Sequence, residues 1–160
     1  MTDKKILVAY FSATGTTAGV AEKLATAVDA DLFAITPVQS YSDADLDWRD
    51  KQSRSSIEMQ DLNSRPEIAA KVENMQQYSV VFVGFPIWWY REPSIIDTFM
   101  ESYDFTGKTI VPFATSGSSS IGDCGKNIQK LAPQATVYSG KRFSADVEGE
   151  ELHKWAEQWL

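Results

Sequence analysis

Three short stretches of this 160-residue sequence carry side chains suited to holding a small ligand. The first covers residues 10–17 and surrounds one glycine with hydroxyl groups, those of Ser12, Thr14, Thr16 and Thr17 around Gly15. If a helix begins here, its free N–H groups and its partial positive charge would bind a phosphate. An ordinary turn, in which Ser and Thr only cap the helix, explains the same residues equally well.

The first stretch differs from two common phosphate-binding motifs. It contains no Lys or Arg, so it is not the nucleoside-triphosphate loop G-x-x-x-x-G-K-[ST]. It also lacks the spacing G-x-G-x-x-G that dinucleotide-binding turns use. Neutral donors alone suit a terminal phosphomonoester.

The second stretch is aromatic and reads Gly84-Phe85-Pro86-Ile87-Trp88-Trp89-Tyr90. Side chains of adjacent residues diverge, so these rings cannot all enter one core. We therefore expect at least one of Trp88 and Trp89 to line a crevice. A planar ligand stacked on that ring would gain about 0.5–1.5 kcal/mol beyond its buried area. The alternative is that both Trp side chains cap the end of a sheet core.

The third stretch, residues 115–123, is rich in small side chains and reads Thr-Ser-Gly-Ser-Ser-Ser-Ile-Gly-Asp. Small residues let backbone N–H and C=O groups approach a ligand closely. The composition alone is typical of a flexible loop. Its position gives it more weight, because this stretch, like the other two, directly follows an apolar segment.

Short apolar segments rich in β-branched and aromatic residues predict the strands that would deliver these stretches. The segments are 6–11, 32–36, 80–85, 109–114, and 136–138 with a continuation toward Phe143. Residues 6–11 and 80–85 lack polar alternation, which is typical of parallel strands covered on both faces. Helical spacing between the strands predicts helices near 17–29, 64–75, 93–100, 123–131 and 150–159. The second of these helices would begin at the capping-box spacing of Ser64 to Glu67.

This alternation predicts an α/β fold in one domain that spans residues 1–160. Right-handed crossovers place helices on both faces of a parallel sheet, and ligands bind beyond the carboxyl ends of its strands. We therefore expect the three stretches to meet at one edge. Residues 37–63 form an irregular surface excursion, in which apolar anchors such as Tyr41, Leu46 and Trp48 favour partial order.

Composition excludes several classes of protein. The chain has 22 Asp and Glu against 15 Lys and Arg, and its net charge of -7 repels a nucleic-acid backbone. The single Cys124 allows neither an internal disulfide nor a Cys-built zinc site, and it suits a reducing compartment, the cytoplasm by default. The apolar run 6–11 is too short for a membrane span or a signal peptide. We expect a soluble protein without a metal site, in which His153 is exposed and Cys124 is a packing residue.

Taken together, the three stretches resemble the flavodoxin family, and the resemblance covers residues 5–160. Its most specific pieces are residues 10–17, residues 84–90 and the run Pro112-Phe113-Ala114-Thr115-Ser116-Gly117. It implies a flavodoxin-like three-layer sandwich with five parallel strands in the order 2-1-3-4-5, and flavin mononucleotide (FMN) at the switch point between strands one and three. It assigns the phosphate to Ser12, Thr14, Gly15, Thr16 and Thr17, the isoalloxazine ring and ribityl chain to Pro86, Ile87, Trp88 and Trp89, and the other side of the ring to Thr115, Ser116, Gly117 and Asp123.

The resemblance implies an electron carrier in which non-covalent FMN does the redox chemistry and no side chain is catalytic. Its partners would be a reductase of the flavodoxin reductase type and protein electron acceptors. Acidic side chains such as Asp43, Asp45 and Asp47 would steer a basic partner or simply keep the protein soluble. One alternative is an FMN-dependent NAD(P)H:quinone-type oxidoreductase, with residues 37–63 as a substrate lid. Another is a non-redox module that binds a phosphate ligand on the same scaffold.

Overall fold

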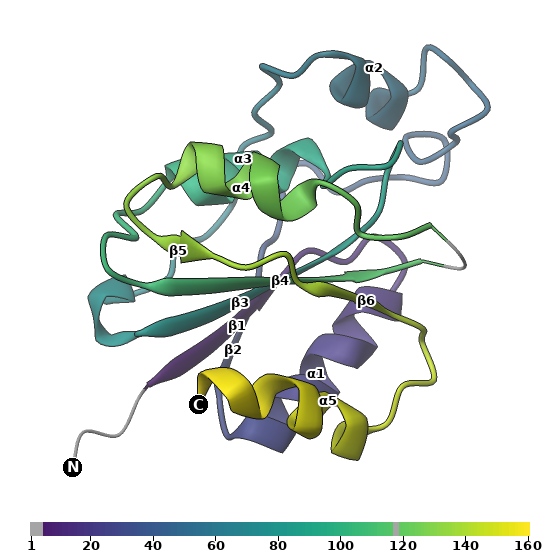
Figure 1. Ribbon diagram of the computed structural model, residues 1–160. Helices are drawn as coiled ribbons and strands as arrows, with labels where there is room; N and C mark the ends of the chain where they lie inside the picture. The colour runs from purple at the N-terminus through teal and green to yellow at the C-terminus, as the bar shows by residue number, and fades with distance from the viewer. Residues whose placement is uncertain (1–4, 117–118) are drawn as a thin grey trace.

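The computed structural model describes residues 5–116 and 119–160 and shows a parallel sheet between two layers of helices (Figure 1). The strands are β1 (Ile6–Tyr10), β2 (Asp31–Ala34), β3 (Val80–Pro86), β4 (Thr109–Thr115), β5 (Thr136–Val137) and β6 (Lys141–Phe143). Their order is β2-β1-β3-β4-β5, β6 also pairs with β4, and all these pairs are parallel. The predicted flavodoxin-like α/β fold and strand order are therefore confirmed.

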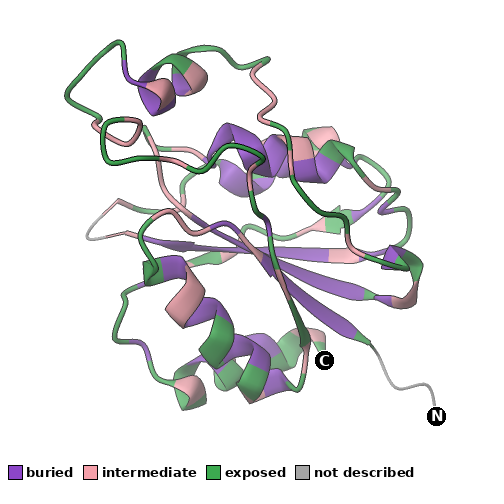
Figure 2. Cartoon of the chain, turned by 180° about the vertical axis from the view of Figure 1, so that it is seen from behind, coloured by how far each residue is buried: buried purple, intermediate pink, exposed green. Residues whose placement is uncertain are grey.

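Helices cover both faces of the sheet, as its apolar strands require. In Figure 1, α3 (Ser94–Glu101) and α4 (Cys124–Leu131) lie on one face, and α1 (Thr16–Val28) and α5 (Gly149–Ala156) lie on the other. Alternate residues of β3 enter opposite cores: Val81 and Val83 pack on the side of α3, and Val80 and Phe82 on the side of α1. The buried strands between partly exposed helices are visible in Figure 2.

The predicted fifth strand is split into β5 and β6 by a break at Gly140. Its φ of 76° lies in the left-handed region, and a Cβ placed there would lie 2.0 Å from the carbonyl oxygen of Pro112. Pro112, in the neighbouring strand β4, has no N–H to donate to a ladder. Only glycine allows the edge strand to pass this close to Pro112 and resume its pairing at Lys141.

The prediction of a helix near residues 64–75 is wrong. Residues 67–69 instead run antiparallel to residues 36–38: Val38 N–H donates to the Glu67 carbonyl at 2.9 Å, and Ala69 N–H donates to the Thr36 carbonyl at 2.7 Å. A helix would need the same backbone groups for its own bonds, so tertiary pairing overrides the local capping signal. The only regular element described between residues 64 and 79 is the 3₁₀ turn Met75–Gln77.

Residues 37–63 contain a short helix that the sequence pattern does not predict, α2 (Arg54–Gln60). Ser53 caps it, because its side-chain oxygen accepts a hydrogen bond from the Ser56 N–H at 3.3 Å. Arg54 then joins the helix to the start of the segment: its guanidinium lies 3.9 Å from the centroid of the Tyr41 ring and forms an ion pair with Glu58 at 3.0 Å. The segment is thus folded on itself above the helix layer of α3 (Figure 1).

Candidate functional site

Thr115, the last residue of β4, contacts both of the other predicted loops. Its hydroxyl oxygen lies 2.7 Å from that of Thr17, and its carbonyl accepts a hydrogen bond from the Ile87 N–H at 3.3 Å. Pro86 is its register partner at the end of β3. The structure therefore brings the three stretches together at one edge of the sheet, as parallel strands require.

The β1–α1 loop presents backbone donors without opposing charge. Gly15 has a φ of 97° and precedes Thr16, the first residue of α1, and the first turn of this helix has no acidic residue. The N–H groups of a first helical turn have no acceptor within the helix. Ser12 Oγ accepts the Gly15 N–H at 3.0 Å and so shapes the turn, while Thr14 and Thr16 are exposed. An anion placed here would meet free N–H groups and hydroxyls.

Thr17 faces the protein interior. Its side chain is 1% exposed, and its hydroxyl is engaged with that of Thr115. Among the predicted phosphate ligands, Thr17 therefore differs from the exposed Thr14 and Thr16, because its side chain joins the loop to β4.

The β3–α3 loop is a tight hairpin turn with two aromatic residues at its tip. Trp88 and Arg91 exchange backbone hydrogen bonds of 3.0 and 3.1 Å. Between them, Trp89 and Tyr90 have φ values of 48° and 65°, a conformation that favours Gly or Asn. Bulky side chains held in this region are strained, and such strain concentrates at functional sites.

The structure answers which Trp side chain faces the crevice. Trp88 packs edge-on against Phe11 and Tyr41, with ring centroids 5.6 and 5.4 Å apart. Trp89 is 41% exposed. Trp88 thus belongs to an aromatic cluster at the end of the sheet, whereas the Trp89 ring is available to stack on a planar ligand.

A buried ionic network, which the sequence interpretation missed, supports the hairpin. The Arg91 guanidinium lies 3.4 Å from Asp97 Oδ2 and 3.6 Å from Glu92 Oε2. The Asn127 amide donates to Glu92 Oε1 at 3.1 Å, and the side chains of Glu92 and Asp97 are both buried. Burial, followed by the interaction with Glu92, raises the pKa of Asp97 to about 8, so Asp97 holds its proton at neutral pH. The sequence does contain a signal for this network, because Arg91, Glu92 and Asp97 are charged residues within the largely apolar run 84–100.

An arginine from the sheet edge organises the β4–α4 loop. Arg142, in β6, donates from Nε to Ser116 Oγ at 3.1 Å and from Nη2 to the Ser116 carbonyl at 2.7 Å. Ser116 Oγ in turn donates to the Ser119 carbonyl at 2.5 Å. No local sequence pattern marks Arg142, because only the pairing of β6 with β4 brings it to this loop.

The remaining predicted residues of this loop differ in position. Gly117 lies outside the described residues. Asp123 precedes α4, is exposed, and lies 3.6 Å from Lys126 Nζ on its own helix. Of this predicted set, Thr115 is the residue that bonds to both of the other loops, whereas Ser116 is bound by Arg142 of β6.

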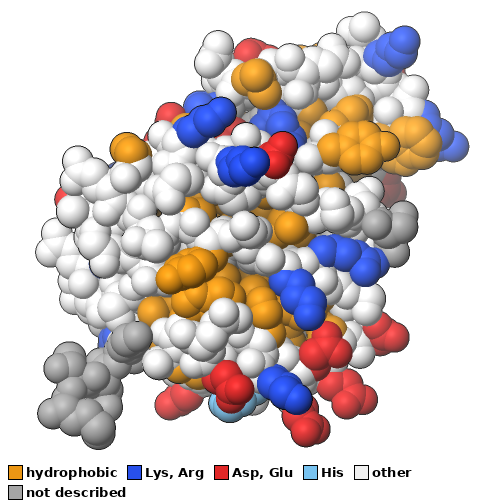
Figure 3. Space-filling view, viewed as in Figure 1, with side chains coloured by type: hydrophobic (Ala, Val, Ile, Leu, Met, Phe, Trp, Pro, Cys, Tyr) orange, Lys and Arg blue, Asp and Glu red, His pale blue; other side chains and the backbone are white. Residues whose placement is uncertain are grey.

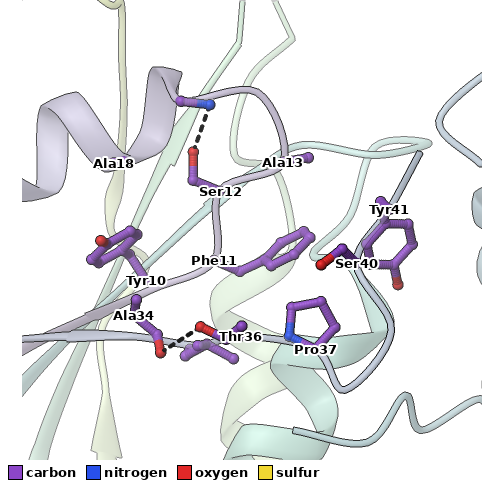
Figure 4. Close-up of a pocket in the computed structure, with 12 residues that line it drawn as sticks. Tyr10, Phe11, Ser12, Ala13, Ala18, Ala34, Thr36, Pro37, Ser40 and Tyr41 are labelled. Atoms are coloured by element: carbon purple, nitrogen blue, oxygen red, sulfur yellow. Dashed lines mark hydrogen bonds between the residues drawn. The ribbon is translucent and has the colours of Figure 1, made fainter. Parts of the chain in front are cut away.

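Two cavities flank the aromatic cluster of Phe11, Tyr41 and Trp88. One of about 340 Å³ lies between the β1–α1 loop and the end of β2, and its wall includes Ser12 and Gly15 (Figure 4). The other, of about 510 Å³, is lined by Leu46, Trp48, Ser55, Ile87, Trp88, Trp89, Tyr90 and Ser119. Residues of the β1–α1 loop therefore line one cavity and residues of the β3–α3 hairpin line the other.

Two further residues considered from the sequence do not line either cavity. Cys124 is buried, and burial raises the pKa of its thiol to about 12, which suits a packing residue. His153 is exposed on α5, 4.0 Å from Glu157. Across residues 5–116 and 119–160, no helix is long and apolar enough to cross a bilayer, and no cluster of His, Cys, Asp and Glu is suited to a metal ion.

Solved structures similar to this chain share its fold over nearly its whole length. A "putative flavoprotein" from Bacteroides eggerthii is 50% identical, with a TM-score of 0.92 and coverage of 98% of both chains. One from Bacteroides uniformis is 47% identical, with a TM-score of 0.91 and coverage of 98% of this chain and 99% of the other. A flavoprotein from Lactobacillus acidophilus, solved in complex with FMN, is 22% identical, with a TM-score of 0.74 and coverage of 96% and 99%.

Sequence comparison gives a second, independent line of evidence. No curated protein matches this sequence. Residues 5–159, however, match the sequence profile of a family described as flavodoxin. This match covers nearly the whole chain, and the strand order and the three loops that meet at Thr115 agree with it. The protein therefore belongs to the flavodoxin family.

Proposed function

We propose that this protein binds FMN non-covalently and carries electrons between partner proteins. The observation that carries the proposal is the convergence at Thr115 of an anion-binding helix start, an exposed Trp ring and a loop of small residues. The FMN complex of the Lactobacillus acidophilus flavoprotein, which shares the fold, supports the choice of ligand.

The donor set fits FMN. The exposed hydroxyls of Thr14 and Thr16 and the N–H groups that begin α1 would hold the phosphate, while Ser12 and Thr17 keep the loop in place. These donors are neutral, which suffices for a phosphomonoester at a helix N-terminus. FMN, when bound, supplies the redox chemistry.

The isoalloxazine ring would pack between two walls. Trp89 offers an exposed ring face from the β3–α3 loop, and Ile87 and Trp88 line the same cavity. Pro86, at the end of β3, would contact the ring from the same side. Ser116, which Arg142 holds in place, would form the opposite wall. The side chains would thus orient the ring and shield one side from water, and none of them is required to transfer a proton.

A protein electron donor fits this site better than NAD(P)H. The residues that line the cavity beside Trp89 are all uncharged, whereas a dinucleotide carries an anionic diphosphate. We therefore propose a reductase of the flavodoxin reductase type as donor and a protein as acceptor. The reducing cytoplasm, which a single buried Cys124 suits, would be the compartment.

Anaerobic stopped-flow spectroscopy of the FMN-loaded protein tests the proposal. We expect slow bleaching of the flavin by NADH or NADPH alone and rapid bleaching once a flavodoxin reductase is added. Rapid bleaching by NADPH alone would instead support the oxidoreductase. A colourless protein that FMN does not reconstitute would reject both and leave the non-redox phosphate-binding module.

A further inference from the structure

Arg142, in β6, is connected to the aromatic cavity through hydrogen bonds of the β4–α4 loop. Its guanidinium donates to the side-chain and backbone oxygens of Ser116, at 3.1 and 2.7 Å. The Ser116 hydroxyl donates in turn to the carbonyl of Ser119, which lines the cavity of about 510 Å³ where the isoalloxazine ring would pack. Two hydrogen bonds in series therefore join Arg142 to the wall of that cavity.

The pairing of β6 with β4 fixes the position of this arginine. Arg142 is the register partner of Ala114, the residue before Thr115, to which the other two loops are bonded. The side chain of Arg142 is partly buried, whereas the preceding Lys141 is exposed, because neighbouring residues of a strand point to opposite faces. The fold thus directs one of two adjacent cations toward the three loops and the other toward solvent.

The guanidinium of Arg142 brings a permanent positive charge to this edge of the sheet, because an arginine stays protonated in proteins. Among the described residues that line the two cavities beside the aromatic cluster, none is charged at neutral pH. In Figure 3, Lys and Arg side chains lie over the edge of the sheet around β6, and Asp and Glu side chains gather lower in the view, near α5. Salt screens a partly buried charge less than an exposed one. Arg142 would therefore attract a negative charge that forms in the site.

Reduction of FMN creates such a charge. Two electrons from the donor protein and one proton from water convert the neutral oxidised ring into a reduced ring with one negative charge, and nearby protein charges change the balance between the two forms. We propose that Arg142 is a positioning residue for this step, which holds Ser116 beside the flavin and, through its charge, favours the reduced anionic ring over the oxidised ring. This inference rests on the proposed function, because it requires bound FMN.

Anaerobic redox titration of the FMN-loaded protein, followed by flavin absorbance, tests this role. Arg142→Gln should weaken binding of reduced FMN about tenfold relative to oxidised FMN, which lowers the two-electron midpoint potential by about 30 mV. Arg142→Lys keeps the charge and should shift the midpoint by less than half as much. Lys141→Gln is the matched control, because it removes an exposed charge from the adjacent position of β6 and should leave the midpoint unchanged. The midpoint depends only on the ratio of the two affinities, so a general loosening of the site would not move it.

The outcomes separate this inference from the function on which it rests. A midpoint that is unchanged in Arg142→Gln, or an equal shift in Lys141→Gln, would overturn the role of Arg142 and leave FMN binding intact. A shift in Arg142→Lys as large as in Arg142→Gln would also overturn it, because the charge would then not be the cause. Arg142→Met, a second neutral variant, carries the same expectation as Arg142→Gln, and circular dichroism shows that each variant is folded. An apoprotein that does not take up FMN would instead reject the proposed function first.

Discussion

The β1–α1 loop and the β3–α3 hairpin lie at the same edge of the sheet but are built in opposite ways. The β1–α1 loop uses a glycine at positive φ and a hydrogen bond between Ser12 and Gly15, three residues apart. The hairpin places Trp89 and Tyr90 at positive φ and depends on a buried ionic network that reaches α3 and α4. One loop is shaped by its own residues, and the other is imposed by the rest of the fold.

This difference separates two ways of preparing a site for a ligand. Exposed backbone donors need little support, because a helix start and a glycine supply them locally. Bulky residues held at positive φ in a turn carry backbone strain, on the order of 1–3 kcal/mol per residue. That cost persists only where other contacts offset it. The two loops should therefore respond differently to substitution, in the following order of magnitude.

Arg91→Ala should give the largest effect, a loss of about 3–5 kcal/mol in the free energy of unfolding. It would leave the buried carboxyl groups of Glu92 and Asp97 without their nearest cation. Urea denaturation measures the loss. Arg49→Ala is the control, because this 75% exposed side chain also pairs with an Asp, and we expect a change below about 0.5 kcal/mol. Equal effects of the two substitutions would show that the network does not hold the hairpin.

The second prediction concerns pH. Because the pKa of Asp97 is raised from an ordinary value of 3.8 to about 8, the folded protein holds a proton that the unfolded chain releases between these two pH values. The contribution of this group to the free energy of unfolding therefore decreases from about pH 4 to about pH 8 and is constant above that range. In Asp97→Asn, this decrease of a few kcal/mol in the free energy of unfolding should be absent. Parallel stability–pH curves for the variant and the wild type would contradict the raised pKa of Asp97.

The third prediction tests the β1–α1 loop. Thr14→Ala combined with Thr16→Ala should weaken FMN binding about 100-fold, because each hydroxyl bonded to a charged phosphate contributes about 1.5–3 kcal/mol, less where water competes. Titration of the apoprotein by flavin fluorescence gives the affinity. The free energy of unfolding should stay near that of the wild type, since both side chains are exposed. Thr26→Ala, at an exposed position of α1, is the control, and an equal loss there would refute the assignment.

The smallest effects come from exchanging backbone preferences between the two loops. Tyr90→Gly should raise the free energy of unfolding by about 1 kcal/mol, because glycine adopts a φ of 65° without strain. Gly15→Ala should lower it by a similar amount, since nothing crowds a Cβ there but a φ of 97° disfavours one. Thermal unfolding measures both changes. Loss of stability in both variants would mean that the hairpin is not strained.

Several elements were predictable because their signals are local. The buried run Val80–Phe85 and the hydroxyl-rich stretch before α1 indicated a parallel sheet and a loop that leads into a helix at its edge, and the structure has both. The helix expected from Ser64 to Met75 failed because its backbone pairs with residues 36–38 instead. Arg142 could not be recognised, since its contact with Ser116 spans 26 residues of sequence and depends on the break at Gly140.

The sequence by itself determined the alternation of strands and helices, the polar β1–α1 loop and the presence of adjacent Trp residues. Periodicity and glycine preference act within a few residues, so they can be recognised without the fold. Only the tertiary structure decided that Trp88 faces inward and Trp89 outward, that burial raises the pKa of Asp97, and that Trp48 lines a cavity. Burial, ring orientation and the pKa of a carboxyl group depend on neighbours far away in the chain, which only folding brings together.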